Sequence, residues 1–151
     1  MNTSRLLLVD DDDDVAEVFV EILSSEGYQV DRAADGAEGL NRLRAGTTPS
    51  LVLLDWTMPK VSGPEMARTM QRDLEWSRIP IVLVTAGDQA KDKALAMNAW
   101  GYLKKPVNSD DLVRMVDAIV REPTTLRSGH PGLVSTRPAA GPSIPPNEAL
   151  F

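Results

Sequence analysis

Five consecutive aspartates, at positions 10–14, follow directly after an apolar run at positions 6–9. Four large apolar residues in a row predict a strand that is buried on both faces, as the strands of parallel sheets are. Two carboxylates about 4 Å apart repel each other by roughly 4 kcal/mol at an effective dielectric constant of 20. Because open α/β sheets bind their ligands at the carboxyl edge, the acids predict a bound cation where this strand ends.

Composition excludes several kinds of functional site. The chain of 151 residues is long enough for one domain with one core. It has no cysteine and one histidine, His130, which excludes disulfides and metal centres built from thiolates or a histidine cluster. A Ser-His-Asp triad is disfavoured on the same ground. The net charge of -6 argues against direct binding to nucleic acid.

The apolar stretches are too short for a secretory signal or a membrane span. The run near the N-terminus contains four large apolar residues and ends in acid, whereas a membrane span needs about 18 or more apolar residues. We therefore expect a cytoplasmic protein that does not insert into membranes.

Segments typical of strands and of helices alternate five times along the chain. Besides residues 6–9, strands are predicted at residues 28–33, 51–54, 80–84 and 101–104. Each strand is followed by a helical segment, and these helices begin near positions 13, 36, 64, 88 and 109. The alternation predicts an α/β fold, a doubly wound five-stranded parallel sheet with helices on both faces.

Several residues are predicted to begin or end these helices. Asp12 or Asp13 is expected to cap the first helix, and the other acids of the run favour its positive N-terminal end. Gly27 and Asn98 suit the left-handed backbone that closes a helix. Ser109 is expected to cap the last helix.

The composition changes after Arg121. Residues 122–151 contain six of the eleven prolines and lack the periodicity of a helix or a strand. We interpret residues 1–121 as one folded domain and residues 122–151 as a Pro-rich, disordered C-terminal tail.

Polar side chains follow four of the five predicted strands, at carboxyl ends that converge on one crevice of a doubly wound sheet. A hard divalent cation such as Mg2+ binds carboxylates together with water and phosphate oxygens. Lysine and threonine donate hydrogen bonds to phosphoryl oxygens. This set predicts phosphoryl transfer, in which positioning and charge neutralisation contribute most. Its members are Asp10, Asp11, Asp55, Thr85 and Lys105.

Four motifs surround these strand ends: VDD at 9–11, LLDWTMP at 53–59, IVLVTA at 81–86 and GYLKKP at 101–106. Together they resemble the receiver domain of two-component response regulators, over about residues 4–121. The resemblance implies the flavodoxin-like (βα)5 fold and a stand-alone regulator similar to the chemotaxis regulators. It also implies a regulatory domain and not an enzyme, since such a domain assists only its own phosphorylation and dephosphorylation.

The resemblance implies roles for individual residues. Asp55 is the expected phosphoacceptor, and the donor is a sensor histidine kinase or a histidine phosphotransfer protein. The expected metal is Mg2+ or Mn2+, held by Asp10, Asp11, Asp55 and the backbone carbonyl of Thr57. The expected phosphoryl-binding residues are Thr85, Ala86 and Lys105, and the expected conformational switch pairs Thr85 with Tyr102.

In this family the switch reshapes the surface of the fourth helix, the fifth strand and the fifth helix. That surface is expected to bind a downstream protein, which the sequence does not identify, and the protein is expected to be a monomer or a weak dimer. Trp100, just before the fifth strand, departs from the family pattern and predicts an exposed apolar spot beside that strand.

Two other functions fit parts of the sequence. Within the family, the domain could be a phosphate shuttle or sink without a conformational output. Residues 11–15 also resemble the DxDxV element of small haloacid-dehalogenase-type phosphatases, whose nucleophile is an aspartate after the first strand. That register is wrong, because the acid directly after the apolar run is Asp10, and Asp55 would have no role. An EF-hand is excluded because its required glycine is replaced by Val15.

Overall fold

The computed structural model describes residues 4–46 and 48–121. Five strands form one parallel sheet in the order β2-β1-β3-β4-β5. Their bounds are β1 Arg5–Val9, β2 Gln29–Ala33, β3 Leu51–Asp55, β4 Ile81–Thr85 and β5 Gly101–Lys104. The predicted doubly wound parallel sheet is confirmed, and the tail predicted at residues 122–151 lies outside the described residues.

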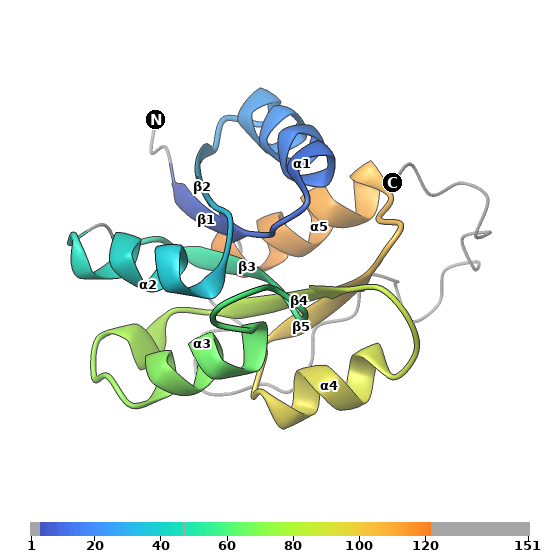
Figure 1. The fold of residues 1–151 in the computed structure, drawn as a ribbon. Coiled ribbons are helices and arrows are strands. Elements are labelled where there is room, and N and C mark those ends of the chain that lie inside the picture. The colour runs from blue at the N-terminus through green and yellow to red at the C-terminus, as the bar shows by residue number, and fades with distance from the viewer. Residues whose placement is uncertain (1–3, 47, 122–151) are drawn as a thin grey trace.

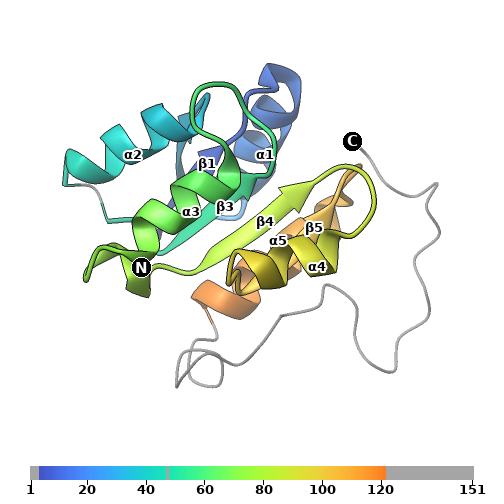
Figure 2. The same ribbon diagram turned by 60° about the horizontal axis from the view of Figure 1, so that its bottom comes forward.

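Within the described residues, five α-helices cover the two faces of the sheet. They are α1 Asp13–Ser25, α2 Gly36–Arg44, α3 Gly63–Gln71, α4 Ala90–Ala96 and α5 Ser109–Val120, and a 3-10 helix, η1 Trp76–Arg78, precedes β4. Helices α1 and α5 lie on one face, and α2, α3 and α4 lie on the other (Figure 1 and Figure 2). No helix of this described part combines the length and apolar character that crossing a membrane requires.

The sheet separates two apolar layers, because successive side chains of a strand point to opposite faces. In β1, Leu7 and Val9 belong to the layer under α2 and α3, whereas Leu6 and Leu8 belong to the layer under α1 and α5. Every residue of β3 and of β4 is buried, which explains why these strands have unbroken apolar sequences. The edge strand β2 is more exposed, as its alternating sequence predicts.

The predicted helix ends agree with the structure at three of four positions. The Asp12 carboxylate accepts hydrogen bonds from two backbone N–H groups of the first turn of α1, and Gly27 and Asn98 have positive φ angles of 93° and 58°. The prediction for Ser109 is wrong, because Asn108 caps α5 and accepts from the Asp110 N–H at 2.8 Å. Asparagine and serine both favour this position, so the sequence alone does not distinguish these two neighbours.

Candidate functional site

The carboxyl ends of β1 and β3 lie side by side at the centre of the sheet. Val9 is in register with Leu54, so Asp10 and Asp55 occupy neighbouring positions at that edge. Asp10, Asp11 and Asp55 each offer one carboxylate oxygen, and these oxygens all lie within 4.8 Å of one another. The structure thus brings together the three carboxylates that the sequence suggested as metal ligands.

Asp10 is almost completely buried, with 1% of its surface exposed, and its carboxylate is held from two directions. Oδ1 accepts a hydrogen bond from the Asp12 N–H at 2.9 Å, and Oδ2 accepts one from the Lys105 ammonium at 2.9 Å. A buried carboxylate needs such partners, because its desolvation is otherwise costly. Asp11, in contrast, is exposed, so its carboxylate is free of this burial penalty.

Lys105 connects the two buried carboxylates. Its Nζ lies 2.9 Å from Asp10 Oδ2 and 3.7 Å from Asp55 Oδ1. Burial alone would lower the pKa of this ammonium, but the hydrogen bond and the charge of Asp10, together with the charge of Asp55, raise it above its usual value. Lys105 is therefore protonated at neutral pH. Its single positive charge only partly balances the carboxylates of Asp10, Asp11 and Asp55.

Asp55 is the last residue of β3 and is buried. Burial and the charge of Asp10 raise its pKa from 3.8 to about 6, although Lys105 and a hydrogen bond from the Trp56 N–H at 2.9 Å oppose the shift. The raised pKa means that the ionised carboxylate is under-compensated by the protein itself. A bound cation would offset this deficit.

Thr85 and Ala86 lie at the end of β4, and Thr57 lies in the loop after β3. The Thr85 side chain is buried, and its hydroxyl donates a hydrogen bond to the Ala86 carbonyl oxygen at 3.1 Å. Ala86 and Thr57 are exposed. All three belong to the same carboxyl edge of the sheet as Asp55, and their predicted contacts with a phosphoryl group or a metal stay predictions.

Tyr102 lies on β5, and its register with Leu83 places it two residues behind Thr85 along the neighbouring strand. Its side chain is half-buried and packs against the apolar layer that also contains Leu83. Because residues two apart on a strand share a face, Thr85 and Tyr102 point to the same side of the sheet, the side covered by α4.

A glycine allows α3 to start directly beside the end of β3. A Cβ at Gly63 would lie 2.1 Å from the Asp55 carbonyl oxygen, closer than any side chain tolerates. The Gly63 N–H also donates to the Trp56 carbonyl oxygen at 3.0 Å. A second contact joins α4 to the residue that follows Asp55. The Lys93 ammonium of α4 lies 5.4 Å from the centre of the Trp56 ring, in a cation–π contact.

Arg32 is a site residue that the sequence analysis did not single out. Its guanidinium reaches from β2 to the Asp10 carbonyl oxygen and to the Asp13 carboxylate. The only sequence feature that could have pointed to Arg32 is its position as a basic residue near the end of the strand predicted at residues 28–33, just before Asp35-Gly36. The alternation of polar and apolar residues along this strand predicts that Arg32 faces away from the core. It does not predict which residues Arg32 contacts.

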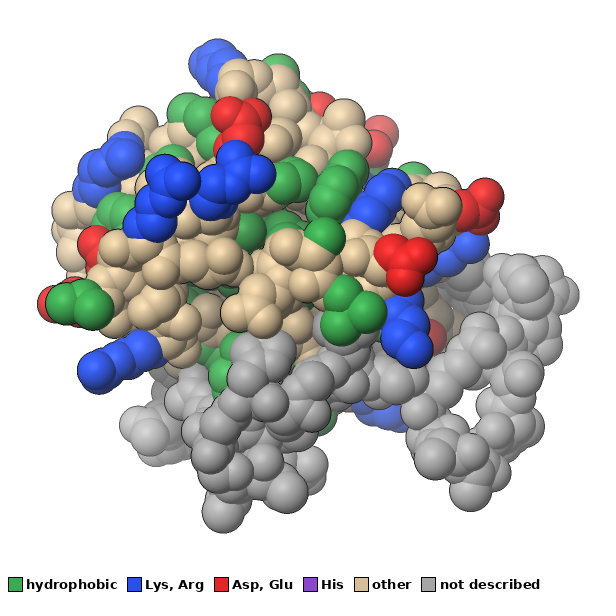
Figure 3. Space-filling view, turned by 90° about the horizontal axis from the view of Figure 1, so that it is seen from below, with side chains coloured by type: hydrophobic (Ala, Val, Ile, Leu, Met, Phe, Trp, Pro, Cys, Tyr) green, Lys and Arg blue, Asp and Glu red, His purple; other side chains and the backbone are tan. Residues whose placement is uncertain are grey.

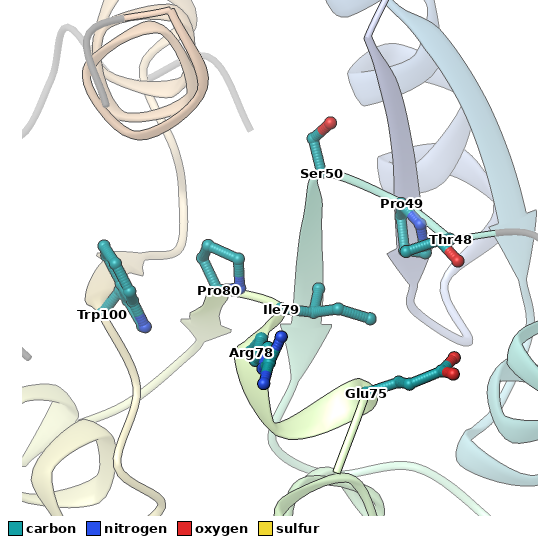
Figure 4. Close-up of a pocket in the computed structure, with 8 residues that line it drawn as sticks. All are labelled: Thr48, Pro49, Ser50, Glu75, Arg78, Ile79, Pro80 and Trp100. Carbon is teal, nitrogen blue, oxygen red and sulfur yellow. The ribbon is translucent and has the colours of Figure 1, made fainter. Parts of the chain in front are cut away.

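A separate groove of about 600 Å3 lies at the opposite, amino edge of the sheet. Figure 4 shows Trp100 and Pro80 on one side of it and Pro49 on the other, with Glu75 and Arg78 contributed by the segment around η1. The expectation that Trp100 forms an exposed spot is corrected here: the ring is half-buried and packs against the layer under α5. It lines this groove, at the end of the sheet away from Asp55.

The chain belongs to the response regulator receiver domain family, since the model of that family matches residues 6–117. Over 119 residues it is 34% identical to Protein PilH of Pseudomonas aeruginosa, an alignment that covers 78% of this chain and 98% of PilH. The structure of the chemotaxis response regulator CheY4 of Vibrio cholerae matches with a TM-score of 0.73 and 26% identity, covering 78% of this chain and 99% of CheY4.

Other relatives are longer than the matched region. The chain is 32% identical over 119 residues to the DNA-binding dual master transcriptional regulator RpaA of Synechocystis, and the match covers 78% of this chain but only 49% of RpaA. The part shared by all these proteins is the receiver domain. Receiver domains are regulatory modules of phosphorelay signalling, which histidine kinases phosphorylate and which act on downstream partners.

Proposed function

We propose that this protein is a phosphorylation-controlled signalling module and that Asp55 is its phosphoacceptor. The observation that carries the proposal is the arrangement around Lys105, whose ammonium lies 2.9 Å from the Asp10 carboxylate and 3.7 Å from that of Asp55. Asp55 is thereby a buried carboxylate beside a fixed positive charge, at the ligand-binding edge of the sheet.

In the proposed reaction, an Asp55 carboxylate oxygen attacks the phosphorus of a phosphohistidine on a sensor histidine kinase or a histidine phosphotransfer protein. A phosphorus–oxygen bond forms, the phosphorus–nitrogen bond breaks, and the nitrogen keeps the electron pair and then takes a proton from water. Lys105, the Thr85 hydroxyl and Ala86 bind the oxygens of the transferred group. Such reactions depend on positioning and on charge neutralisation more than on covalent assistance from the protein.

The carboxylates of Asp10, Asp11 and Asp55, the acid cluster, fit Mg2+ or Mn2+ as cofactor. Three carboxylates lie within 4.8 Å, and hard divalent cations prefer oxygen ligands of this kind. Asp10, Asp11 and Asp55 would hold the ion, together with the backbone carbonyl of Thr57. When bound, the ion supplies positive charge against the phosphoryl oxygens and the clustered carboxylates. Without it, the charge of Lys105 alone opposes them.

The proposed output is a change of the surface formed by α4, β5 and α5. The supporting observation is that Thr85 and Tyr102 point to the same side of the sheet on adjacent strands, two residues apart in register. A shift of Thr85 toward a phosphoryl group would open space into which Tyr102 can turn. Figure 3 shows the helical side of the molecule that carries α3 and α4, where basic, acidic and hydrophobic side chains are interspersed. Leu95 of α4 is 56% exposed and offers an apolar contact for a downstream protein.

The test is phosphorylation by acetyl phosphate in the presence of Mg2+, followed by mapping of the modified residue by mass spectrometry. The label is expected on Asp55, and it should be lost in Asp55→Asn and when a chelator removes the metal. Asp14→Asn is the matched control, because it removes an exposed acid of the same run and should leave the label in place. A label on Asp10 or Asp11, or one that persists in Asp55→Asn, would refute the proposal.

The output is tested separately with beryllofluoride, which mimics the phosphoryl group. A downstream protein captured by the full chain should bind with different affinity in the presence and absence of beryllofluoride. Equal affinities would indicate a phosphate shuttle or sink, in which Asp55 is phosphorylated without changing the partner surface.

A further inference from the structure

The Arg32 guanidinium makes three contacts with the acidic loop that follows β1. Its Nε and Nη2 donate hydrogen bonds to the Asp10 carbonyl oxygen at 3.2 and 2.8 Å. Its Nη1 lies 2.8 Å from Asp13 Oδ1. The planar fork of an arginine holds a carbonyl and a carboxylate in one fixed geometry, whereas the ammonium of a lysine is a compact charge on a flexible stem.

These contacts complete the fixation of Asp10. Its N–H donates to the Ala33 carbonyl oxygen at 3.1 Å, and its carboxylate is held by the Asp12 N–H and by Lys105. With Arg32 on the carbonyl oxygen, the backbone of Asp10 is held on both sides and its side chain at both oxygens. The orientation of this carboxylate is therefore set by the protein.

We propose that Arg32 is a positioning residue for the acid cluster: it fixes Asp10 in the orientation that binds a divalent cation and engages Asp13 in an ion pair outside the cluster. This inference rests on the proposed function, in which Asp10, Asp11 and Asp55 hold Mg2+. It also separates the pair of ligands, Asp10 and Asp11, from two of the other three aspartates of the run. Asp12 caps α1, and Asp13 is paired with Arg32.

Charge and positioning predict opposite effects of removing Arg32. As a positive charge near the cluster, Arg32 repels a second cation, so its loss alone would strengthen Mg2+ binding. As a positioning residue, it lowers the cost of ordering the ligands, so its loss would weaken binding. Residues that orient metal ligands from outside typically change metal affinity by 10- to 100-fold when mutated. The sign of the change therefore separates the two roles.

The test is isothermal titration of the full chain with MgCl2, comparing wild type with Arg32→Ala, Arg32→Lys and Arg5→Ala. We expect Arg32→Ala to bind Mg2+ about tenfold more weakly. Arg32→Lys keeps the charge and loses the fork, and should also bind more weakly than wild type. Arg5→Ala is the matched control, because Arg5 also pairs with an aspartate, Asp31, but at the amino edge of the sheet, and its removal should leave Mg2+ affinity unchanged.

A second measurement follows the loop without metal. Hydrogen exchange of the Asp12 amide, which donates to Asp10 Oδ1, should be faster in Arg32→Ala and in Arg32→Lys than in wild type. Mg2+ binding by Arg32→Ala equal to or tighter than that of wild type would overturn the inference, as would an Arg32→Lys variant identical to wild type in both measurements. If Arg32→Ala does not fold, Arg32→Lys decides the question alone. A wild-type chain that binds no Mg2+ would instead refute the proposed function.

Discussion

The backbone N–H of Lys105 donates a hydrogen bond to the Thr85 carbonyl oxygen at 2.8 Å. Thr85 is in register with Lys104, the last residue of β5. The hydrogen bond from the Lys105 backbone therefore extends the pairing of β4 and β5 by one residue. The backbone thus fixes to each other the two residues proposed to bind phosphoryl oxygens by their side chains. A movement of the end of β4 toward Asp55 would be passed to Lys105 through this bond and through the sheet.

The position of Lys105 between two buried carboxylates predicts the effect of removing its charge. Lys105→Met keeps the length of the side chain but leaves Asp10 and Asp55 without their shared cation. We expect the free energy of unfolding of the metal-free protein to fall by about 3 kcal/mol, because one partner of a buried ion pair is lost. MgCl2 should recover more stability in this variant than in wild type, since the metal then becomes the main counter-charge. Urea denaturation with and without MgCl2 measures both effects.

The control for this prediction is Lys104→Met. The Lys104 ammonium is exposed and lies 3.7 Å from the exposed Asp88 carboxylate, so its loss should change the free energy of unfolding by less than about 0.5 kcal/mol. Equal destabilisation by the two substitutions would contradict the role assigned to Lys105.

Asp11 differs from Asp10 because it is exposed, and this difference predicts a variant that loses metal binding without losing stability. Asp11→Asn removes one of the three clustered carboxylates and should weaken Mg2+ binding at least about tenfold, with little change in the melting temperature of the metal-free protein. Asp14→Asn removes the same charge from an exposed position in the same run and should leave Mg2+ affinity nearly unchanged. Titration calorimetry checks the affinities, and equal effects of the two variants would show that only the overall negative charge matters.

Much of this site could be predicted because its chemistry follows from where the strands end. Parallel strands place their carboxyl ends at one edge, so Asp10, Asp55 and Thr85 had to converge once the alternation of strands and helices was recognised. The apolar runs that precede them identified the strands without reference to any side-chain contact. The backbone conformations of Gly27 and Asn98 were predictable for a similar reason, since few other residues adopt positive φ.

What the sequence did not predict depends on how far side chains reach across the fold. Arg32 was one polar residue on an alternating strand, and its contacts with Asp10 depend on the register of β2 against β1. Trp100 precedes a strand, and only the packing of α5 and the loop before β4 decides that its ring is half-buried. In both cases the decisive partners lie far away in the sequence.

Gly63 offers a test of how closely α3 must approach β3. A Cβ at this position would lie 2.1 Å from the Asp55 carbonyl oxygen, which is backbone and cannot turn aside. Gly63→Ala should therefore lower the free energy of unfolding by about 2 kcal/mol or more and displace the segment that carries Asp55. Pro64→Ala, in the same helical turn, should cost less than about 1 kcal/mol. Thermal denaturation of both variants makes the comparison, and a Gly63→Ala variant as stable as Pro64→Ala would contradict the close approach.

The raised pKa of Asp55 predicts that its ionised carboxylate destabilises the metal-free protein at neutral pH. The pKa is about 6 in the folded protein and 3.8 for an ordinary aspartate, so between these values the folded state binds more protons than the unfolded chain. The contribution of Asp55 to the free energy of unfolding then falls as pH rises from about 4 to about 6. Asp55→Asn removes this cost and should be more stable than wild type at pH 7 by roughly 1–3 kcal/mol, with the advantage disappearing as pH falls toward 4.

The measurement is urea denaturation of wild type and Asp55→Asn at several pH values, with a chelator present. Asp14→Asn is the control, since this exposed acid should show no comparable dependence on pH. Addition of MgCl2 at pH 7 should narrow the difference, because the metal offsets the buried charge in wild type and has one carboxylate less to bind in the variant. An Asp55→Asn protein that is less stable than wild type at pH 7, or whose advantage is the same at pH 4 and pH 7, would show that Lys105 already compensates Asp55 in full.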